Sequence, residues 1–396
     1  MINLARIRDE TTGVTHCIHL NNAGSGLMPI PVVSAVKDYI DLEARMGGYE
    51  AAAHEAERLG NVYHSVARLI NCSTEEVALL ENATMAWDMA FYSFVISRNL
   101  QPGDKILTVN AEYAANYVAY LQMQKRYGFE IVIIPDDETG ATDVAALEAM
   151  IDERVKLISI TYIPTNGGLV NPAEVIGRIA NAHNIPYLLD GCQAPGQMPV
   201  DVKKLGCDMF TATGRKFLRG PRGTGFLYIR KSLLETIEPF FIDHFAAEWT
   251  SKGVYELRCD ARRFENWENA YALRLGLGVA IDYALELGLE NIQDRAWGLA
   301  AGMRKELAQI PGIELRDVGQ EMCAIVTFTL KNIPSTDIKN RLTQKNINIS
   351  VSGASSTLLD ATNRNLPGIV RASPHYYNSE DEIDQFISAV RELAPS

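Results

Sequence analysis

Residues 155–191, VKLISITYIPTNGGLVNPAEVIGRIANAHNIPYLLDG, contain the pattern that decides the fold. Two apolar runs rich in branched residues, at 155–163 and 186–191, predict buried strands bounded by Gly, Pro, Asn or Asp. Between them, residues 171–184 open with Asn-Pro, a signature of helix starts, and predict a helix. The order strand, helix, strand is typical of a parallel sheet covered by helices.

The same alternation extends to both sides of this stretch. Apolar runs predict further strands at 104–109, 129–135 and 209–213, and a helical pattern that ends in Gly occupies 114–128. Alternation repeated in this way predicts an α/β fold, with a mostly parallel sheet that carries helices on both faces.

The pattern changes after about residue 260. Helical stretches at 268–288 and 293–309 precede separated strand candidates at 323–330 and 346–350, and a last helical pattern occupies 379–394. We therefore expect three parts: an N-terminal segment (1–20), a large α/β domain (21–260) and a smaller C-terminal α+β domain (261–396).

Composition and charge exclude several classes of partner. The 396 residues carry a formal net charge of −12, which argues against nucleic acid or an anionic membrane as the main partner. No apolar run predicts a transmembrane helix, and the N-terminus lacks the apolar core of a signal peptide, so we expect a cytoplasmic location. The six cysteines form no CxxC pair and the seven histidines no HExxH motif, so we expect reduced thiols and no metal site.

Polar residues follow two of the predicted strands, at the sheet edge where open α/β sheets bind ligands. Asp190 ends one apolar strand, where an ionised carboxylate is costly without a partner, and Lys216 follows the next strand. Asp190 alone is also compatible with a helix cap or a turn, and the two residues with an ion pair. Both also match pyridoxal 5′-phosphate (PLP), which needs a lysine for its Schiff base, an acid at its ring nitrogen and an anion site.

Residues 81–95, ENATMAWDMAFYSFV, meet the requirement for an anion site. They place Ala83 and Thr84 at the start of a helical pattern, where main-chain N–H groups and a hydroxyl bind anions. A simple N-cap is the alternative interpretation of Thr84. Arg215, directly before Lys216, would lower the pKa of the lysine and could also face the phosphate.

Beyond these residues, an ordered set of motifs resembles the class V aminotransferases. These are fold-type I PLP enzymes that include cysteine desulfurases, selenocysteine lyases, cystine C–S lyases and isopenicillin N epimerases. The motifs span nearly the whole chain: HLNNAGSGLMP (19–29), ENATMA, AEYAAN, IPTNGGLVNP, LLDGCQAPGQMPVDV, TATGRKFLRGPRGTGFLYI, RFENWE (263–268) and VRASPHYYNSEDEIDQF (370–386). The resemblance implies a large domain around a mostly parallel, seven-stranded type of sheet, a smaller C-terminal α+β domain, and a homodimer with shared active sites.

The resemblance also implies a role for each matched residue around the cofactor ring. Lys216 would form the Schiff base and move the substrate Cα proton. Asp190 would pair with the pyridine nitrogen, and Gln193 would contact the ring hydroxyl. Thr165 or Asn166 would approach the same hydroxyl, because the register of IPTNGG is open by one residue.

Two further sets of residues would bind the anionic groups. The implied phosphate contacts are Ala83, Thr84, Thr213 and Arg215, where many relatives have His in place of Arg215. The implied substrate contacts are Asn22, Ala23, Gly24 and Arg371. The guanidinium fork of Arg371 is well shaped for the substrate α-carboxylate. Without the surrounding motif, a surface salt bridge would be the preferred interpretation of Arg371.

Two departures from the family pattern bear on the reaction. Desulfurases commonly stack a His on the cofactor ring where this chain has Tyr113. An aromatic ring can stack there, but an acid–base role inferred for the histidine does not carry over to a tyrosine. A core-facing aromatic is the alternative interpretation of Tyr113. Desulfurases also carry a nucleophilic Cys before the carboxylate-binding arginine, whereas residues 350–373 contain none. Since a thiolate is needed to accept sulfur as a persulfide, we do not expect that type of sulfur transfer.

The sequence thus predicts a PLP enzyme that acts on an amino acid. The first expectation is β-elimination of a sulfur group from a cysteine conjugate, a cysteine S-oxide or cystine. Transamination and epimerisation are the alternatives with the same cofactor. A nicotinamide-dependent oxidoreductase is disfavoured because GPRGTG (220–225) runs into a strand rather than a helix. Glu268 falls where relatives place a neutral phosphate contact from the second subunit, and its substitute is not evident.

Overall fold

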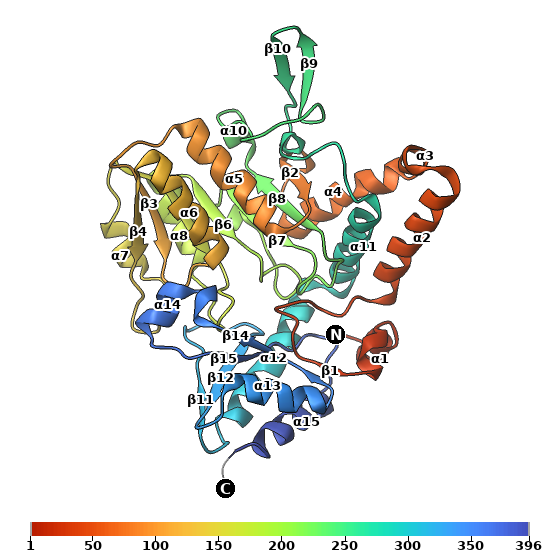
Figure 1. Cartoon of the computed structure of the whole chain (residues 1–396), viewed down its shortest axis with the longest axis vertical. Coiled ribbons are helices and arrows are strands. Elements are labelled where there is room, and N and C mark those ends of the chain that lie inside the picture. The colour runs from red at the N-terminus through yellow and green to blue at the C-terminus, as the bar shows by residue number, and fades with distance from the viewer. Residues whose placement is uncertain (1, 395–396) are drawn as a thin grey trace.

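A seven-stranded sheet forms the centre of the upper part of the molecule in Figure 1, a computed structural model that describes residues 2–394. Its strand order is β2-β8-β7-β6-β5-β3-β4, and only β8 runs antiparallel to its neighbours. The strands are β2 (Val77–Leu80), β3 (Lys105–Val109), β4 (Glu130–Ile134), β5 (Val155–Thr161), β6 (Tyr187–Asp190), β7 (Met209–Thr213) and β8 (Gly225–Ile229). The predicted α/β class with a mostly parallel sheet is confirmed.

Helices cover both faces of this sheet, which is why its central strands are buried along almost their whole length. Leu188 of β6 belongs to a core cluster with α5 (Ala83–Arg98) and α6 (Ala114–Tyr127). Leu189, which points to the other face, packs in the core cluster that includes α4 (Ala56–Ile70) and α8 (Ala173–Ala182). Side chains alternate between the faces of a strand, so a sheet buried on both sides has no polar face.

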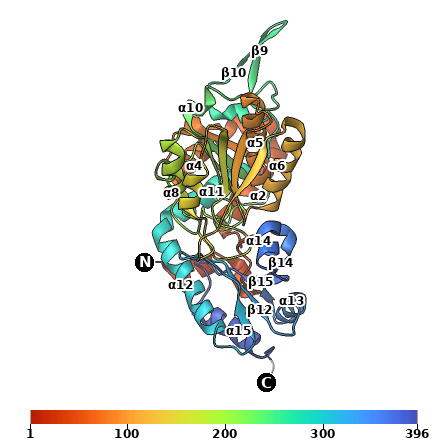
Figure 2. The same ribbon diagram turned by 90° about the vertical axis from the view of Figure 1, so that its left-hand side faces the viewer.

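Several further helices lie within the first 287 residues. They are α1 (Leu4–Asp9), α2 (Ile30–Met46), α3 (Gly48–His54), α7 (Val144–Ala149), α9 (Val202–Leu205), α10 (Lys231–Leu234) and α11 (Tyr271–Leu287), with short 3₁₀ helices at Thr12–Thr15, Thr74–Glu76 and Ala261–Phe264. A hairpin of β9 (Ala247–Ser251) and β10 (Val254–Leu257) projects from the body in both views (Figures 1 and 2). Its residues carry no strong period-two pattern, and the sequence analysis missed it.

A second, antiparallel sheet lies in the lower part of the molecule, in the order β11-β12-β15-β14 (Figure 1). The strands are β11 (Ile313–Leu315), β12 (Val326–Leu330), β14 (Ser350–Ser352) and β15 (Ile369–Ala372). The accompanying helices are α12 (Leu289–Leu307), α13 (Ser335–Gln344), α14 (Leu358–Asn363) and α15 (Glu380–Arg391), with a 3₁₀ helix at Ala354–Ser356. No helix within residues 2–394 combines the length and apolarity that crossing a membrane requires.

The N-terminal segment is joined to the C-terminal part rather than standing alone. Its strand β1 (Ile18–His19) pairs in parallel with β13 (Ile347–Asn348), the strand candidate expected at 346–350. The three-part division at residues 20 and 260 stays a prediction.

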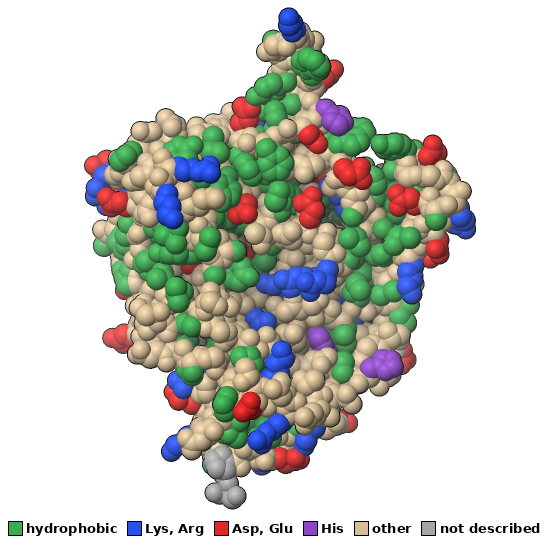
Figure 3. All heavy atoms as spheres, viewed as in Figure 1, with side chains coloured by type: hydrophobic (Ala, Val, Ile, Leu, Met, Phe, Trp, Pro, Cys, Tyr) green, Lys and Arg blue, Asp and Glu red, His purple; other side chains and the backbone are tan. Residues whose placement is uncertain are grey.

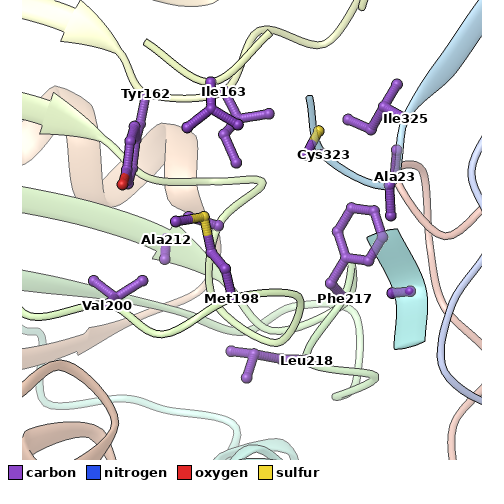
Figure 4. Close-up of a cluster of buried hydrophobic side chains, with 14 of the residues drawn as sticks. Ala23, Tyr162, Ile163, Met198, Val200, Ala212, Phe217, Leu218, Cys323 and Ile325 are labelled. Atoms are coloured by element: carbon purple, nitrogen blue, oxygen red, sulfur yellow. The ribbon is translucent and has the colours of Figure 1, made fainter. Parts of the chain in front are cut away.

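A buried cluster ties the loop after β7 to the rest of the core (Figure 4). Phe217 and Leu218, which directly follow Lys216, are buried in this cluster. Cys323 and Ile325 approach Phe217 from the C-terminal part, and Ala23 from the stretch that follows β1. The backbone around Lys216 is therefore fixed by packing from three distant parts of the chain.

Candidate active site

One cavity of about 540 Å³ lies at the carboxyl ends of β5, β6 and β7, beside the start of α5. In Figure 3, Lys and Arg side chains gather in the middle of the face shown, between the upper and lower parts of the molecule. Nine of the expected residues line the cavity: Ala83, Thr84, Tyr113, Thr165, Asp190, Gln193, Thr213, Arg215 and Lys216. Two other hollows, of about 670 and 700 Å³, contain none of the expected residues. Choosing the candidate site by cavity volume alone would therefore miss the cavity that contains the expected residues.

Lys216 has the environment of an amine that can react. Burial lowers its pKa, and the positive charges of Arg215 and Arg371 act in the same direction. Among residues 2–394, no carboxylate lies within ion-pair distance of its Nζ atom. The sequence analysis attributed the lowered pKa to Arg215, but desolvation is the larger cause. A larger fraction of neutral amine favours attack on a carbonyl.

Asp190 is a buried carboxylate that no basic residue neutralises in the part of the chain described. Its side chain ends β6, and the residue is 5% exposed. One oxygen accepts a hydrogen bond from the main-chain N–H of Cys192 at 2.9 Å, and the other accepts one from the Asn116 amide at 2.9 Å. The expected alternative, an ion pair with Lys216, is not formed. Such a carboxylate fits a protonated ring nitrogen, which would supply the missing positive charge.

The start of α5 is arranged as an anion site. Asn82, not Thr84, caps the helix by accepting from the N–H of Met85 at 2.9 Å, so the N-cap interpretation of Thr84 is wrong. Gly225 of β8 lies directly behind, where a Cβ atom would come within 3.0 Å of the Ala83 nitrogen. Exposed Thr84 lines the cavity, whereas the hydroxyl of Thr213 donates to Thr224 O at 3.1 Å. Helix-start N–H groups beside a hydroxyl fit a phosphate.

Arg371 is a buried arginine without a carboxylate. It is 7% exposed, and its Nη1 donates to the hydroxyl of Thr165 at 2.6 Å and to the Thr165 carbonyl at 3.1 Å. Its Nε is buried with no partner, and burial lowers the pKa of the guanidinium to about 10. The interpretation of Arg371 as a surface salt bridge is therefore wrong. A buried cation with a free donor fits a small anion such as a carboxylate.

Asn22, Ala23 and Gly24, which are expected near the substrate, bond to residues around the cavity rather than facing into it. Asn22 is fully engaged, because its amide donates to Ser373 O at 2.8 Å and its oxygen accepts from Tyr377 at 2.5 Å. The carbonyl of Ala23 accepts from the Gln193 amide at 3.2 Å, and the carbonyl of Gly24 accepts from Arg215. These three residues do not line the cavity itself, and their expected substrate contacts stay predictions.

Two buried amide oxygens near the cavity have no partner. They are Oε1 of Gln193 and Oδ1 of Asn166, whose own amide nitrogen donates to Thr357 at 2.9 Å. Orphaned polar atoms of this kind are costly, and a bound group with a hydroxyl could satisfy them. Thr165 lines the cavity, whereas Asn166 lies behind it. The open register between these two residues stays open.

Four functional candidates were missed by the sequence analysis. They are Glu112, Asn116, Thr161 and Arg222, of which Thr161 and Arg222 line the cavity. Glu112 precedes α6 and Asn116 lies in its first turn, and no pattern in AEYAAN indicates that their side chains meet. Within residues 2–394 no cluster of His, Cys, Asp and Glu is placed to hold a metal ion.

Comparisons with known proteins agree with this geometry. The family described as aminotransferase class-V matches residues 18–386. A probable cysteine desulfurase from Methanothermobacter thermautotrophicus is 28% identical over 384 residues, which cover 95% of this chain and 94% of that protein. The apo cysteine desulfurase from Thermococcus onnurineus NA1 has a TM-score of 0.93 at 25% identity, over 100% of this chain and 98% of that one. The cystine C–S lyase C-DES, solved with its product cysteine persulfide, shares the fold, with a TM-score of 0.87, 21% identity and coverage of 97% and 100%.

Proposed function

The chain belongs to the aminotransferase class-V family and is a PLP-dependent enzyme, and we propose that it cleaves a Cβ–S bond by β-elimination from an amino acid. The substrate would be a cysteine conjugate, a cysteine S-oxide or cystine. The relatives are named probable cysteine desulfurases, and cysteine is an amino acid that carries sulfur on Cβ, which supports this substrate class.

The residues around the cavity are suited to hold PLP and its substrate. When bound, PLP withdraws electrons from Cα of the amino acid and so makes the Cα proton acidic. Asp190 would hold the proton on the ring nitrogen, and the start of α5 would bind the phosphate. Arg371 would bind the α-carboxylate, which fixes the position of Cα relative to the cofactor.

Lys216 would accept the Cα proton on Nζ, because burial lowers its pKa toward the range of a useful base. Loss of that proton breaks the Cα–H bond, and its electrons form a Cα–Cβ double bond as the sulfur group leaves Cβ. A proton delivered to the leaving group completes the sulfur product, which is a thiol from a cysteine conjugate, a sulfenic acid from a cysteine S-oxide and a persulfide from cystine. The other product, 2-aminoacrylate, reacts with water to give pyruvate and ammonium.

One observation carries the choice of elimination over sulfur transfer: residues 350–373, which precede and include Arg371, contain no cysteine. Of the six free cysteines, only Cys192 is among the described residues that line the cavity. Burial raises the pKa of its thiol to about 12, so Cys192 would hold little thiolate at neutral pH. A persulfide-forming nucleophile is therefore not supported, and the sulfur group would leave directly.

A panel of substrates tests this proposal. With an S-alkyl cysteine, a cysteine S-oxide and cystine, we expect pyruvate and ammonium in equal amounts with the thiol or corresponding sulfur product. Conversion of the cofactor to pyridoxamine phosphate with release of the intact 2-oxo acid would instead indicate an aminotransferase. Loss of optical activity without any keto acid would indicate an epimerase. Either result would overturn the elimination.

A homodimer and a cytoplasmic location complete the proposal. The family resemblance implies active sites shared across a dimer, and Glu268, at the matching segment, is exposed on the single chain. A second copy could therefore contact it. The location rests on the sequence expectation alone.

A further inference from the structure

A fully buried glutamate lies behind the cavity wall. Glu112 is 2% exposed and has no basic partner among residues 2–394. Its Oε1 accepts hydrogen bonds from the Thr161 hydroxyl at 2.5 Å, the Asn116 amide at 2.8 Å and the main-chain N–H of Tyr113 at 2.9 Å. Its Oε2 accepts one from Thr108 at 2.9 Å. Four hydrogen-bond donors therefore converge on the Glu112 carboxyl group, so its position is fixed by four separate contacts.

Asn116 connects this glutamate to the acid expected at the ring nitrogen. The Asn116 amide nitrogen donates to Glu112 at 2.8 Å and to Asp190 at 2.9 Å, and Asn116 is 3% exposed. Each hydrogen of the amide is thus directed at one of two carboxyl groups. This leaves the amide one orientation that satisfies both, so the position of the Asp190 carboxylate depends on Glu112.

The same glutamate holds the residue expected to stack on the cofactor ring. The main-chain N–H of Tyr113 bonds to Glu112 and also lies 3.3 Å from the hydroxyl of Thr161, which in turn donates to Glu112. Tyr113 is the N-cap of α6 and makes no side-chain cap bond, so Glu112 provides the side-chain acceptor at this helix start. Tyr113, Asp190 and Thr161 all line the cavity.

We propose that Glu112 is a positioning residue. It joins Asp190 and Tyr113 into one hydrogen-bonded unit and so fixes the two residues expected to contact the cofactor ring. The inference rests on the proposed function for its cofactor, and it concerns residues of this chain only. Glu112 does not touch the ring and takes part in no bond change. Its acceptor oxygens, not its charge, do the positioning, because Asn116 and Tyr113 can only donate to them.

The geometry allows the acceptor and the charge to be separated. In Glu112→Gln, the amide oxygen can keep the bonds from Thr161, Asn116 and Tyr113, and the amide nitrogen can donate to the Thr108 hydroxyl. In Glu112→Ala, all four bonds are lost. Glu382 of α15 offers a control, because it is also buried and accepts from an asparagine amide (Asn378, 2.8 Å) and a main-chain N–H (Ser379, 3.2 Å). Unlike Glu112, it also pairs with a base, Arg8, at 2.8 Å.

The test measures PLP binding to the apoprotein by titration, together with the circular dichroism of the bound cofactor in the visible range. We expect Glu112→Ala to raise the Kd for PLP at least tenfold and to reduce the cofactor signal, with Glu112→Gln within threefold of the wild type. Glu382→Ala should lower the melting temperature but leave both cofactor measurements unchanged. If Glu112→Ala does not fold, Asn116→Leu should show the same weakened binding.

Three results would overturn the inference while PLP still binds the wild type. The first is unchanged PLP affinity in Glu112→Ala, or in Asn116→Leu if the alanine variant does not fold. The second is an equal loss of PLP affinity in Glu112→Gln and Glu112→Ala. The third is a loss of PLP affinity in Glu382→Ala as large as that in Glu112→Ala. A wild-type protein that binds no PLP at all would overturn the proposed function itself, and this inference with it. The two kinds of failure are therefore distinguishable.

Discussion

At the scale of single residues, the site is defined by charges that have no partner within the described part of the chain. Asp190 and Glu112 are buried acids without a base, and Arg371 is a buried base without an acid. Leaving such groups unpaired is costly unless they become neutral or bind a ligand, and Glu112, with a pKa raised by burial, belongs to the first case. The pattern of missing partners therefore describes the ligand: a cation at Asp190 and an anion at Arg371.

Arg371→Lys tests the anion site. Lysine retains the positive charge but loses the planar fork that binds a carboxylate with two hydrogen bonds. We expect kcat/KM for the amino-acid substrate to fall between about tenfold and a hundredfold, mainly through KM, while PLP binding is retained. Steady-state kinetics and a PLP titration check this. A wild-type KM in the lysine variant would remove Arg371 from the carboxylate site.

The ionisation of Glu112 should appear in the stability of the protein. Burial raises the pKa of Glu112 to about 7, and the charge of Asp190 acts in the same direction. Hydrogen bonds from Thr161 and Asn116 lower the pKa and so oppose this shift. Tyr120 is the other titratable group nearby. An unfolded glutamate titrates near 4.5, so the native state binds more protons and Glu112 destabilises the fold as pH rises from about 4.5 to 7. The effect amounts to at most about 3 kcal/mol.

Glu112→Gln removes this titration. The free energy of unfolding of the variant, relative to the wild type, should therefore increase between pH 5 and pH 8, by up to about 3 kcal/mol. Urea unfolding of the two apoproteins at both pH values measures the difference. A difference that stays constant with pH would show that Glu112 has an ordinary pKa.

The sequence could predict the site residues whose place follows from the strands, but not the contacts that depend on side-chain packing. Lys216 and Asp190 follow strands directly, so their place at one sheet edge could be expected from the sequence. The bridge from Glu112 through Asn116 to Asp190 could not, because it joins side chains 74 residues apart whose orientations are set by packing. Thr84 was open between cap and ligand contact for the same reason: only the geometry shows that Asn82 makes the cap.

At the scale of elements, the anion site depends on how closely β8 approaches the start of α5. Gly225 allows this approach, because a Cβ atom there would lie 2.7 Å from the Asn82 carbonyl carbon. This carbon and the Ala83 nitrogen, 3.0 Å from the same point, are main-chain atoms and cannot move aside without shifting the helix. The position of the helix-start N–H groups is therefore coupled to the absence of one side chain on the neighbouring strand.

Gly225→Ala should displace the start of α5. We expect a loss of about 1–3 kcal/mol in stability and a weaker affinity for both PLP and inorganic phosphate. Gly298→Ala is the control, because a Cβ atom at that position of α12 meets nothing within 4 Å and should stabilise the helix by up to about 1 kcal/mol. Thermal unfolding with and without PLP checks both. An alanine at 225 that binds PLP normally would contradict the role of this close approach.

Elements were predictable where their pattern is local. The strand at 209–213 coincides with β7, and the helix at 114–128 with α6 to within one residue. The pairing of β1 with β13 was not predictable, since a two-residue strand has no periodicity and its partner is more than 300 residues away. The exposed hairpin of β9 and β10 likewise has no buried face to impose alternation.

At the scale of the whole molecule, the site lies where three regions meet. They are the carboxyl ends of the strands of the large sheet, the stretch after β1 that contains Ala23 and Gly24, and the C-terminal part through Arg371. The single chain also leaves large apolar side chains exposed, among them Trp249 at 77%. Trp249 lies opposite Tyr255 on the projecting hairpin, and the expected second copy could cover this pair.

The expected homodimer makes a direct prediction for the native mass. Light scattering after size-exclusion chromatography should give twice the chain mass of 43.8 kDa across a tenfold range of protein concentration. A constant mass of one chain would contradict the dimer, and the shared active sites with it.

The central claim is that Lys216 carries the cofactor, and borohydride reduction followed by peptide mapping tests it most directly. Reduction of the yellow protein should abolish its visible absorbance and add a pyridoxyl phosphate group to the one peptide that contains Lys216. Lys216→Ala should show neither the absorbance nor the label. A label on a different lysine, or no label on a wild-type protein saturated with PLP, would contradict the account.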